Sequence, residues 1–158
     1  MATEANDAPV REAWLAMQDL LLLGEAQAWL HEAAAAHDVT PSAIKALFRL
    51  EYGGAIAMRD LAEQFRCDAS YITGLVDGLE ERGLAVRQPH PTDRRVKTVI
   101  LTDRGREVTA DLRDRRSVPP PAFDALSAEE QRTLRDLMRR VTAADASLSA
   151  MAKLAPTG

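Results

Sequence analysis

The chain has 158 residues, of which 46% are apolar, enough for one domain with a sizeable core. Aromatic residues make up only 4%, and the abundance of Ala and Leu favours a mainly helical fold. The single cysteine excludes an internal disulfide framework, and no apolar run is long enough to cross a bilayer. Residues 1–9 lack the pattern of a signal peptide. We therefore expect a soluble, cytoplasmic protein.

Positive charge is concentrated in one segment of this acidic chain, whose net charge is −4. Residues 82–106 contain seven Lys or Arg and two acidic residues, a local net charge of +5, which leaves −9 elsewhere. Such polarity suits a protein that presents one face to phosphate groups. The alternative is a solvated basic surface without a nucleic-acid partner.

A long N-terminal helix is predicted from the capping residue Asp7 to about Ala36. Val10, Trp14 and Leu21 follow the helical spacing, and further leucines lie on its other faces. A helix that is apolar on several sides packs against more than one partner, so a subunit interface is expected here. Thr40 caps the next helix, which ends at Gly53-Gly54, and Ile56-Ala57 predicts a short strand.

Two short helices, 58–65 and 68–82, are predicted to meet at a tight turn. Asp68 is a good N-cap for the second, and Gly83 supplies the left-handed residue that ends it. The strand-like run 84–88 then leads to the segment 93–102, which holds a tip dense in positive charge. A helix pair followed by a hairpin is typical of a winged helix-turn-helix, and the predicted fold is mostly α with a small β wing.

Two helices are expected in the remaining part of the chain. Thr102 caps a helix over 103–116, which must end before Pro119-Pro120-Pro121. Ser127 and Glu130 form a capping box for the last helix. The apolar stripe of that last helix consists of Leu134, Leu137, Met138, Val141 and Leu148.

From Asp7 to Ser149, this order of elements resembles the MarR family of bacterial transcription regulators. The most specific likeness is Asp93-Arg94-Arg95 leading to Leu101-Thr102, supported by the segments 58–62 and 75–84. The resemblance implies a symmetric dimer that binds double-stranded DNA at an imperfect palindrome, more often as a repressor of nearby genes.

The resemblance also implies how the chain is divided. Residues 7–52 and 103–150 would form a helical dimerisation region, and 53–102 a winged DNA-binding lobe. Residues 1–6 and 154–158 would be flexible termini. The alternative is a winged-helix dimer that senses a ligand or binds a protein, with weak or lost DNA binding.

The recognition helix is expected to place Ser70, Tyr71 and Thr73 in the major groove, because its N-terminal side chains reach base edges in this motif. Contacts to phosphate, or no contact, are the alternatives for each. Gly74 stands where many relatives carry a basic residue. It weakens the helix and removes a contact, unless it permits a close approach to the backbone. The proline triplet is a second departure, since relatives often continue that helix.

For the wing, the resemblance implies that Arg95 enters the minor groove and that Asp93 orients its guanidinium group. A narrow A·T-rich groove concentrates negative potential and attracts arginine. Arg94 and Lys97 are expected to meet phosphates, which adds affinity but little sequence information. The alternative for Asp93 and Arg95 is a surface ion pair that stabilises the turn.

Relatives often bind small aromatic or phenolic effectors between the dimerisation region and the lobe. The candidate contact residues are Trp14, Trp29, Phe48, Tyr52, His31, His37 and Arg49. Their alternative role is ordinary core packing.

Cys67, directly before the recognition helix, is a redox-sensor candidate, although a lone cysteine in a turn more often packs as a small apolar residue. The three histidines have no metal-ligand spacing, and no nucleophile or phosphate-loop motif is present. We therefore expect no metal site, no cofactor and no enzymatic activity.

Overall fold

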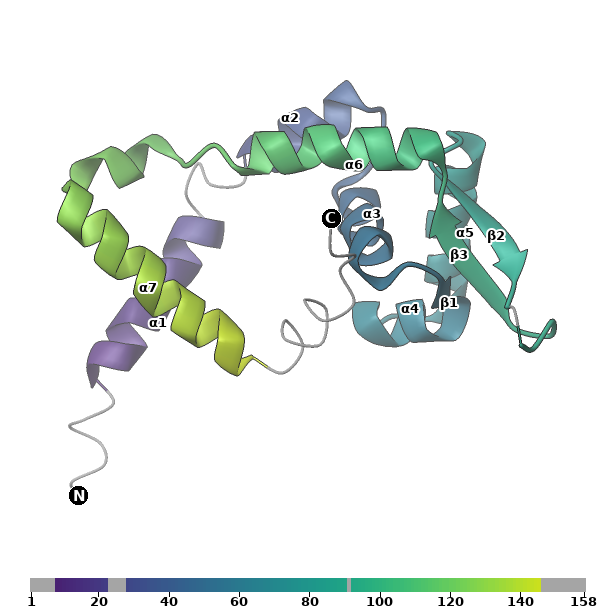
Figure 1. The fold of residues 1–158 in the computed structure, drawn as a ribbon, viewed down its shortest axis with the longest axis horizontal. Helices are drawn as coiled ribbons and strands as arrows, with labels where there is room; N and C mark the ends of the chain where they lie inside the picture. Colours follow the sequence, from purple (N-terminus) through teal and green to yellow (C-terminus); the bar gives the residue numbers. More distant parts are fainter. Residues whose placement is uncertain (1–7, 23–27, 91, 146–158) are drawn as a thin grey trace, which may run out of the picture.

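The computed structural model describes residues 8–22, 28–90 and 92–145 and shows a winged helix-turn-helix joined to further helices (Figure 1). The predicted fold class, mostly helical with a small β wing, is confirmed. In chain order the elements are α1 (Ala8–Leu22), α2 (Ala28–Ala36), α3 (Pro41–Gly53), β1 (Ile56–Ala57), α4 (Met58–Phe65), α5 (Ala69–Glu81), β2 (Ala85–Pro89), β3 (Lys97–Leu101), α6 (Asp103–Arg116), the 3₁₀ helix η2 (Pro121–Ala125) and α7 (Ala128–Ala144). Within these ranges, no helix is both long and apolar enough to span a membrane.

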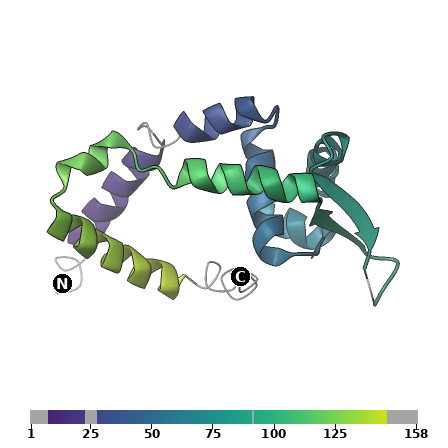
Figure 2. The same ribbon diagram turned by 45° about the horizontal axis from the view of Figure 1, so that its top comes forward.

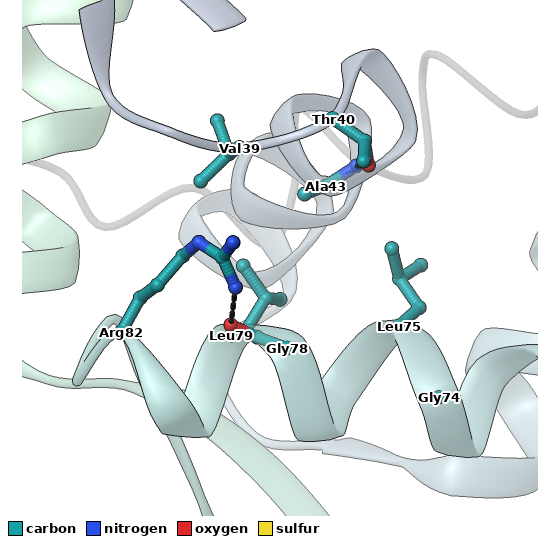
Figure 3. Close-up of a pocket in the computed structure, with 8 residues that line it drawn as sticks. All are labelled: Val39, Thr40, Ala43, Gly74, Leu75, Gly78, Leu79 and Arg82. Atoms are coloured by element: carbon teal, nitrogen blue, oxygen red, sulfur yellow. Dashed lines mark hydrogen bonds between the residues drawn. The ribbon is translucent and has the colours of Figure 1, made fainter. Parts of the chain in front are cut away.

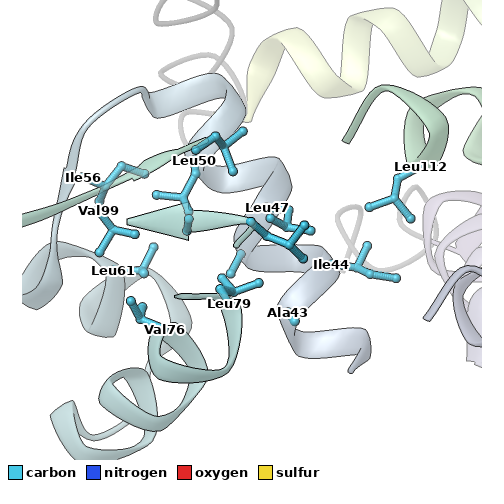
Figure 4. Packing of buried hydrophobic residues seen from close by; sticks show 14 of the residues in the cluster. Ala43, Ile44, Leu47, Leu50, Ile56, Leu61, Val76, Leu79, Val99 and Leu112 are labelled. Atoms are coloured by element: carbon cyan, nitrogen blue, oxygen red, sulfur yellow. The ribbon is translucent and has the colours of Figure 1, made fainter. Parts of the chain in front are cut away.

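One hydrophobic core holds the winged part together and also includes α2, α3 and α6 (Figure 4). Ile44 and Leu47 of α3, Leu61 of α4, Ile72 of α5 and Leu112 of α6 are completely buried. The core therefore crosses the predicted boundary at residue 53, and α3 folds with the winged elements. The functional division of the chain stays a prediction.

The wing is the β2–β3 hairpin of a three-stranded antiparallel sheet with the order β1-β3-β2. Ile56 of β1 and Arg87 of β2 flank Val99 of the central strand, which is fully buried. The hairpin projects from the lobe at the end opposite to α1 and α7 in both views (Figures 1 and 2).

The prediction of one continuous N-terminal helix is wrong. The structure has two helices, α1 and α2, which run in different directions in both views. The residues between them, 23–27, and the predicted cap Asp7 lie outside the described residues. The apolar pattern, which continues through both helices, concealed this change of direction.

Most predicted helix ends are confirmed. The hydroxyls of Thr40, Thr102 and Ser127 accept bonds from backbone N–H groups in the first turns of α3, α6 and α7. Asp68 occupies the N-cap position of α5, but its carboxylate accepts no capping bond. At the other end, Gly83 has φ of 65°, and α6 ends at Arg116, before the prolines.

The end of α5 and the start of α6 meet at a junction that requires glycine. The Leu84 N–H donates to the Leu79 carbonyl, 2.9 Å away, and completes the α5 C-cap. The Leu84 carbonyl accepts from the Thr102 N–H at 3.1 Å. A Cβ on Gly105 would lie 1.9 Å from that same carbonyl oxygen. Only glycine therefore fits at position 105.

The turn between α4 and α5 contains a non-glycine residue in the left-handed conformation. Arg66 has φ of 50°, and its N–H donates to the Glu63 carbonyl at 3.0 Å. For a residue with a Cβ this conformation costs about 1–2 kcal/mol. The predicted turn is correct, but the strain at Arg66 leaves no sequence signal.

Replacing Arg66 by glycine should raise the free energy of unfolding by up to about 1 kcal/mol, because glycine adopts positive φ without steric cost. Urea denaturation followed by circular dichroism measures the change. Arg66→Ala is the matched control, since it removes the side chain but keeps the Cβ. Equal stabilities for the two variants would contradict the strain at this turn.

Candidate DNA interface

The exposed face of α5 carries the three residues predicted to read bases. Ser70, Tyr71 and Thr73 are all exposed, whereas Ile72 and Val76 between and beyond them are fully buried. Tyr71 keeps 48% of its surface accessible, which is high for a large aromatic side chain. The orientation required for DNA contact is therefore present, and the contact itself stays a prediction.

The Thr73 hydroxyl is partly engaged within the helix. It donates its proton to the Ala69 carbonyl, 2.8 Å away. The lone pairs of the hydroxyl oxygen remain available, so Thr73 would act toward DNA as an acceptor or through its methyl group.

Gly74 faces open space. A Cβ built at this position meets no atom of the chain within 4 Å, so packing within the chain does not require glycine here, and the suggestion that Gly74 permits a close approach to the backbone stays a prediction. Gly74 and Gly78 line a cavity of about 100 Å³ between α5 and the start of α3, beside Val39 and Thr40 (Figure 3). The missing side chains leave this depression, and neither backbone position requires glycine by contact with a neighbour.

The wing tip is shaped by Asp93 through the backbone. The Asp93 carboxylate accepts from the Arg95 N–H at 3.0 Å, and the Asp93 carbonyl accepts from the Val96 N–H at 3.0 Å. The His90 N–H closes the tip on the Val96 carbonyl at 2.8 Å. Among the described residues, no bond joins Asp93 to the Arg95 guanidinium group. In the single chain, Asp93 thus fixes the turn, and the orientation of the Arg95 guanidinium group by Asp93 on DNA stays a prediction.

Ion pairing separates the basic residues of segment 82–106 into two sets. Arg82, Arg87 and Arg106 pair with carboxylates. The exposed side chains without an ion pair to any described residue are Arg94, Arg95, Lys97 and Arg104. Three of these four lie at or beside the wing tip. The accessible positive charge is therefore more localised than the sequence count suggested.

Arg82 closes the C-terminal end of α5 onto the loop before α3. Its guanidinium group lies 3.2 Å from the Asp38 carboxylate and donates to the Gly78 carbonyl at 3.0 Å, the contact drawn in Figure 3. It also donates to the Asp38 backbone carbonyl. Arg82 thus has a structural role within the lobe.

The predicted effector residues lie on three different helices. Trp14 belongs to α1 and is 53% exposed, and Trp29 of α2 packs against the lobe core. Phe48, Arg49 and Tyr52 belong to α3 and are half-buried, whereas His31 of α2 is exposed.

Phe48 and Tyr52 both contact Arg116 of α6. The Arg116 guanidinium carbon lies 4.7 Å from the centre of the Phe48 ring, and Arg116 donates to the Tyr52 hydroxyl at 3.5 Å. Sequence reasoning missed Arg116, although the basic last turn of α6 was a visible signal. A role of this group in effector binding stays a prediction.

His37 connects the end of α2 to α6. Its Nε2 lies 2.7 Å from the Asp111 carboxylate, which also accepts from Arg115 at 2.7 Å. These bonds, that of Arg115 first, lower the pKa of Asp111 below its ordinary value. A neighbouring ion pair, Arg113 with Glu51, joins α6 to α3. These contacts favour a structural role for His37.

Cys67 is half-buried and packs against the hydrophobic core. Its Sγ lies 3.9 Å from the Ala62 carbonyl oxygen. This environment agrees with the packing alternative, and the redox role stays a prediction. Within the described ranges, no three His, Cys, Asp or Glu residues gather as a potential metal site.

Comparisons with known proteins agree with this architecture. The model of the MarR family matches residues 39–97, which run from the start of α3 to the far side of the wing tip. Over these residues the chain is similar to the MarR family.

Two curated relatives come from Bacillus subtilis. The uncharacterised HTH-type transcriptional regulator YdgJ is 29% identical over 65% of this chain and 63% of its own length. The HTH-type transcriptional repressor MdtR is 34% identical over 42% of this chain and 43% of its own length. The chain thus spans less than two thirds of either relative. Both are named as transcription regulators.

Solved MarR structures share the fold. Wild-type MarR of E. coli is 24% identical, with a TM-score of 0.66 over 77% of this chain and 90% of its own. A mutant of that protein, complexed with operator DNA, has a TM-score of 0.57 over 85% of this chain and 96% of its own, at 22% identity.

Replacing Gly74 by alanine should raise the free energy of unfolding by about 1 kcal/mol, because alanine favours helix and its Cβ enters open space. Chemical denaturation measures this. Gly105→Ala is the control of opposite sign, since its Cβ would collide with the Leu84 carbonyl oxygen. A loss of stability in the Gly74 variant would contradict the open environment.

Proposed function

We propose that the protein is a dimeric, sequence-specific DNA-binding transcription regulator that reads DNA with α5 and the wing. The observation that carries this proposal is the distribution of accessible charge. Within residues 82–106, the exposed positive side chains without an ion pair to a described residue lie mainly at the wing tip, in the same lobe as the exposed polar face of α5. Both features lie in or beside the residues that match the MarR family model, and both suit DNA binding by such a domain.

In the major groove, Ser70, Tyr71 and Thr73 would contact base edges and thymine methyl groups. In the minor groove, Arg95 would be the inserted side chain, because the Asp93 hydrogen bond fixes its backbone and leaves its guanidinium group exposed. Arg94 and Lys97 would neutralise phosphates on either side.

The exposed apolar faces of α1 and α7 support dimerisation. No residue of either helix is buried in the single chain. The large exposed apolar side chains are Val10, Trp14, Leu15, Leu21 and Leu22 on α1, with Leu137, Met138 and Val141 on α7. Exposed apolar surface of this extent marks an interaction site. In a symmetric dimer, two α5 helices would contact half-sites about 34 Å apart, so the operator would be an imperfect palindrome.

Repression is the mode that the name of MdtR supports. A small aromatic effector, bound between the dimerisation region and the lobe, would alter the affinity for DNA by changing the separation of the two lobes. The contacts of Arg116 with Phe48 and Tyr52, which bring a cationic group together with two aromatic rings, support this proposal. The protein would act in the bacterial cytoplasm.

The second candidate function is a winged-helix module with weak DNA binding. Gly74 favours it, since the recognition helix has no basic side chain at that position. The first test is retardation of the DNA adjacent to the protein's own gene, with unrelated DNA as competitor. Sequence-specific retardation supports the regulator, and no binding at low salt favours the module.

Arg95→Ala should lower operator affinity by roughly 1–3 kcal/mol, about 5- to 150-fold, because a base-reading arginine is lost from the minor groove. Fluorescence anisotropy with operator and unrelated duplexes measures this. Arg94→Ala is the matched control and should weaken binding to both duplexes, with a smaller salt slope. Equal effects of the two substitutions on both duplexes would argue against base reading by Arg95.

Leu21→Glu should convert the dimer to monomers or aggregates, because a charge would be buried in the proposed interface. Light scattering coupled to size-exclusion chromatography gives the mass. Val86→Glu, at an exposed apolar position on the wing, is the control and should remain dimeric. An unaltered dimer of the Leu21 variant would show that the interface lies elsewhere.

A further inference from the structure

Arg87 of the wing strand β2 binds three positions of the recognition helix at once. Its Nη1 lies 2.7 Å from the Asp77 carboxylate and also pairs with Glu80. Its Nη2 donates to the Thr73 backbone carbonyl at 3.1 Å. Its backbone N–H donates to the Glu80 carboxylate at 2.6 Å. One wing residue is therefore bonded to two successive turns of α5.

The bonding pattern excludes Arg87 from the DNA-contacting charge. Its side chain is only 22% exposed, and two carboxylates surround it, so the cluster has a net charge of −1. Such a cluster does not attract phosphate. The planar guanidinium group of Arg87 instead fixes the position of β2 relative to α5, because several of its N–H donors bind acceptors on α5 at the same time.

Arg87 lies on an edge strand of the sheet, and its backbone bond joins that edge to α5. β2 is an edge strand with β3 as its sheet neighbour, and the wing tip follows it directly. The Arg87 N–H bonds to Glu80 of α5, so the free edge of the strand is held by the recognition helix. The Thr73 carbonyl, in turn, belongs to a residue proposed to face bases. The cluster thus joins the wing to the part of α5 that carries Ser70, Tyr71 and Thr73.

We propose that Arg87, held by Asp77 and Glu80, is a positioning residue that locks the wing to the recognition helix. The two parts then meet adjacent grooves at one fixed spacing. This inference deepens the proposed DNA-binding function and rests on it. Its consequence is selectivity: the lock favours operator over unrelated DNA without adding a phosphate contact.

The test uses Arg87→Lys in the full-length protein. Lysine keeps the charge but has one donor nitrogen in place of the planar fork, whose Nη1 binds the two carboxylates while Nη2 binds the Thr73 carbonyl. Two properties are measured: amide order parameters of the wing by NMR without DNA, and affinity for operator and unrelated duplexes at several salt concentrations. Glu80→Gln provides a second variant in case the first is poorly folded, and Arg104→Lys is the matched control at an exposed position.

We expect the Arg87 variant to lower the order parameters of residues 92–97 from about 0.85, typical of rigid backbone, toward 0.6, while α3 is unchanged. Operator preference should fall about tenfold, with the affinity for unrelated DNA and the salt slope preserved. A variant with wild-type wing order and operator preference would overturn the proposal. Failure of the wild type to bind any DNA would reject the proposed function, whereas wing order would still decide whether the lock exists.

Discussion

The packing of the first turn of α6 against the end of α5 is the contact on which the arrangement depends. Gly105 leaves room for the Leu84 carbonyl, which accepts the Thr102 N–H. The Thr102 hydroxyl donates to the Gly83 carbonyl at 2.6 Å and accepts from the Gly105 N–H at 3.0 Å. The recognition helix, both wing strands and α6 therefore meet within a few residues. A side chain at position 105 would separate them.

The position of every candidate DNA-binding group follows from this junction. β2 leaves it after Leu84, and β3 returns to it at Leu101, so the wing begins and ends there. α6 extends from it toward α1 and α7, and its C-terminal half is bound by Glu51, His37 and Phe48 (Figure 1). The lobe and α6 thus form one body, and a dimer built on α1 and α7 would set the distance between two lobes through α6.

Features that depend on neighbouring residues could be predicted from the sequence. Thr40 and Thr102 cap helices because their hydroxyls reach a backbone N–H three residues away, a purely local contact. Gly83 adopts the left-handed conformation for a similarly local reason. The order of elements and the fold class follow from such signals.

Features that depend on distant partners could not be predicted in this way. The charges of Arg82 and Arg87 counted toward a basic surface until the structure showed their carboxylate partners, 44 and at least seven residues away in the chain. The requirement for Gly105 comes from a carbonyl 21 positions earlier. Asp93 was expected to bind the Arg95 guanidinium group, and in the single chain its carboxylate binds the Arg95 backbone N–H. The uniform apolar content of the N-terminal part concealed the separation of α1 from α2.

The central claim, that the wing tip enters the minor groove beside the recognition helix, can be tested by cleavage from a tethered reagent. The chain has one cysteine, so Cys67→Ser provides a background in which Arg94→Cys carries iron–EDTA at the wing tip alone. A label at Glu129→Cys on α7 is the control. We predict strand cleavage at two symmetric positions that flank the operator centre, with the offset between strands typical of the minor groove. Cleavage from position 129 and none from position 94 would contradict the account.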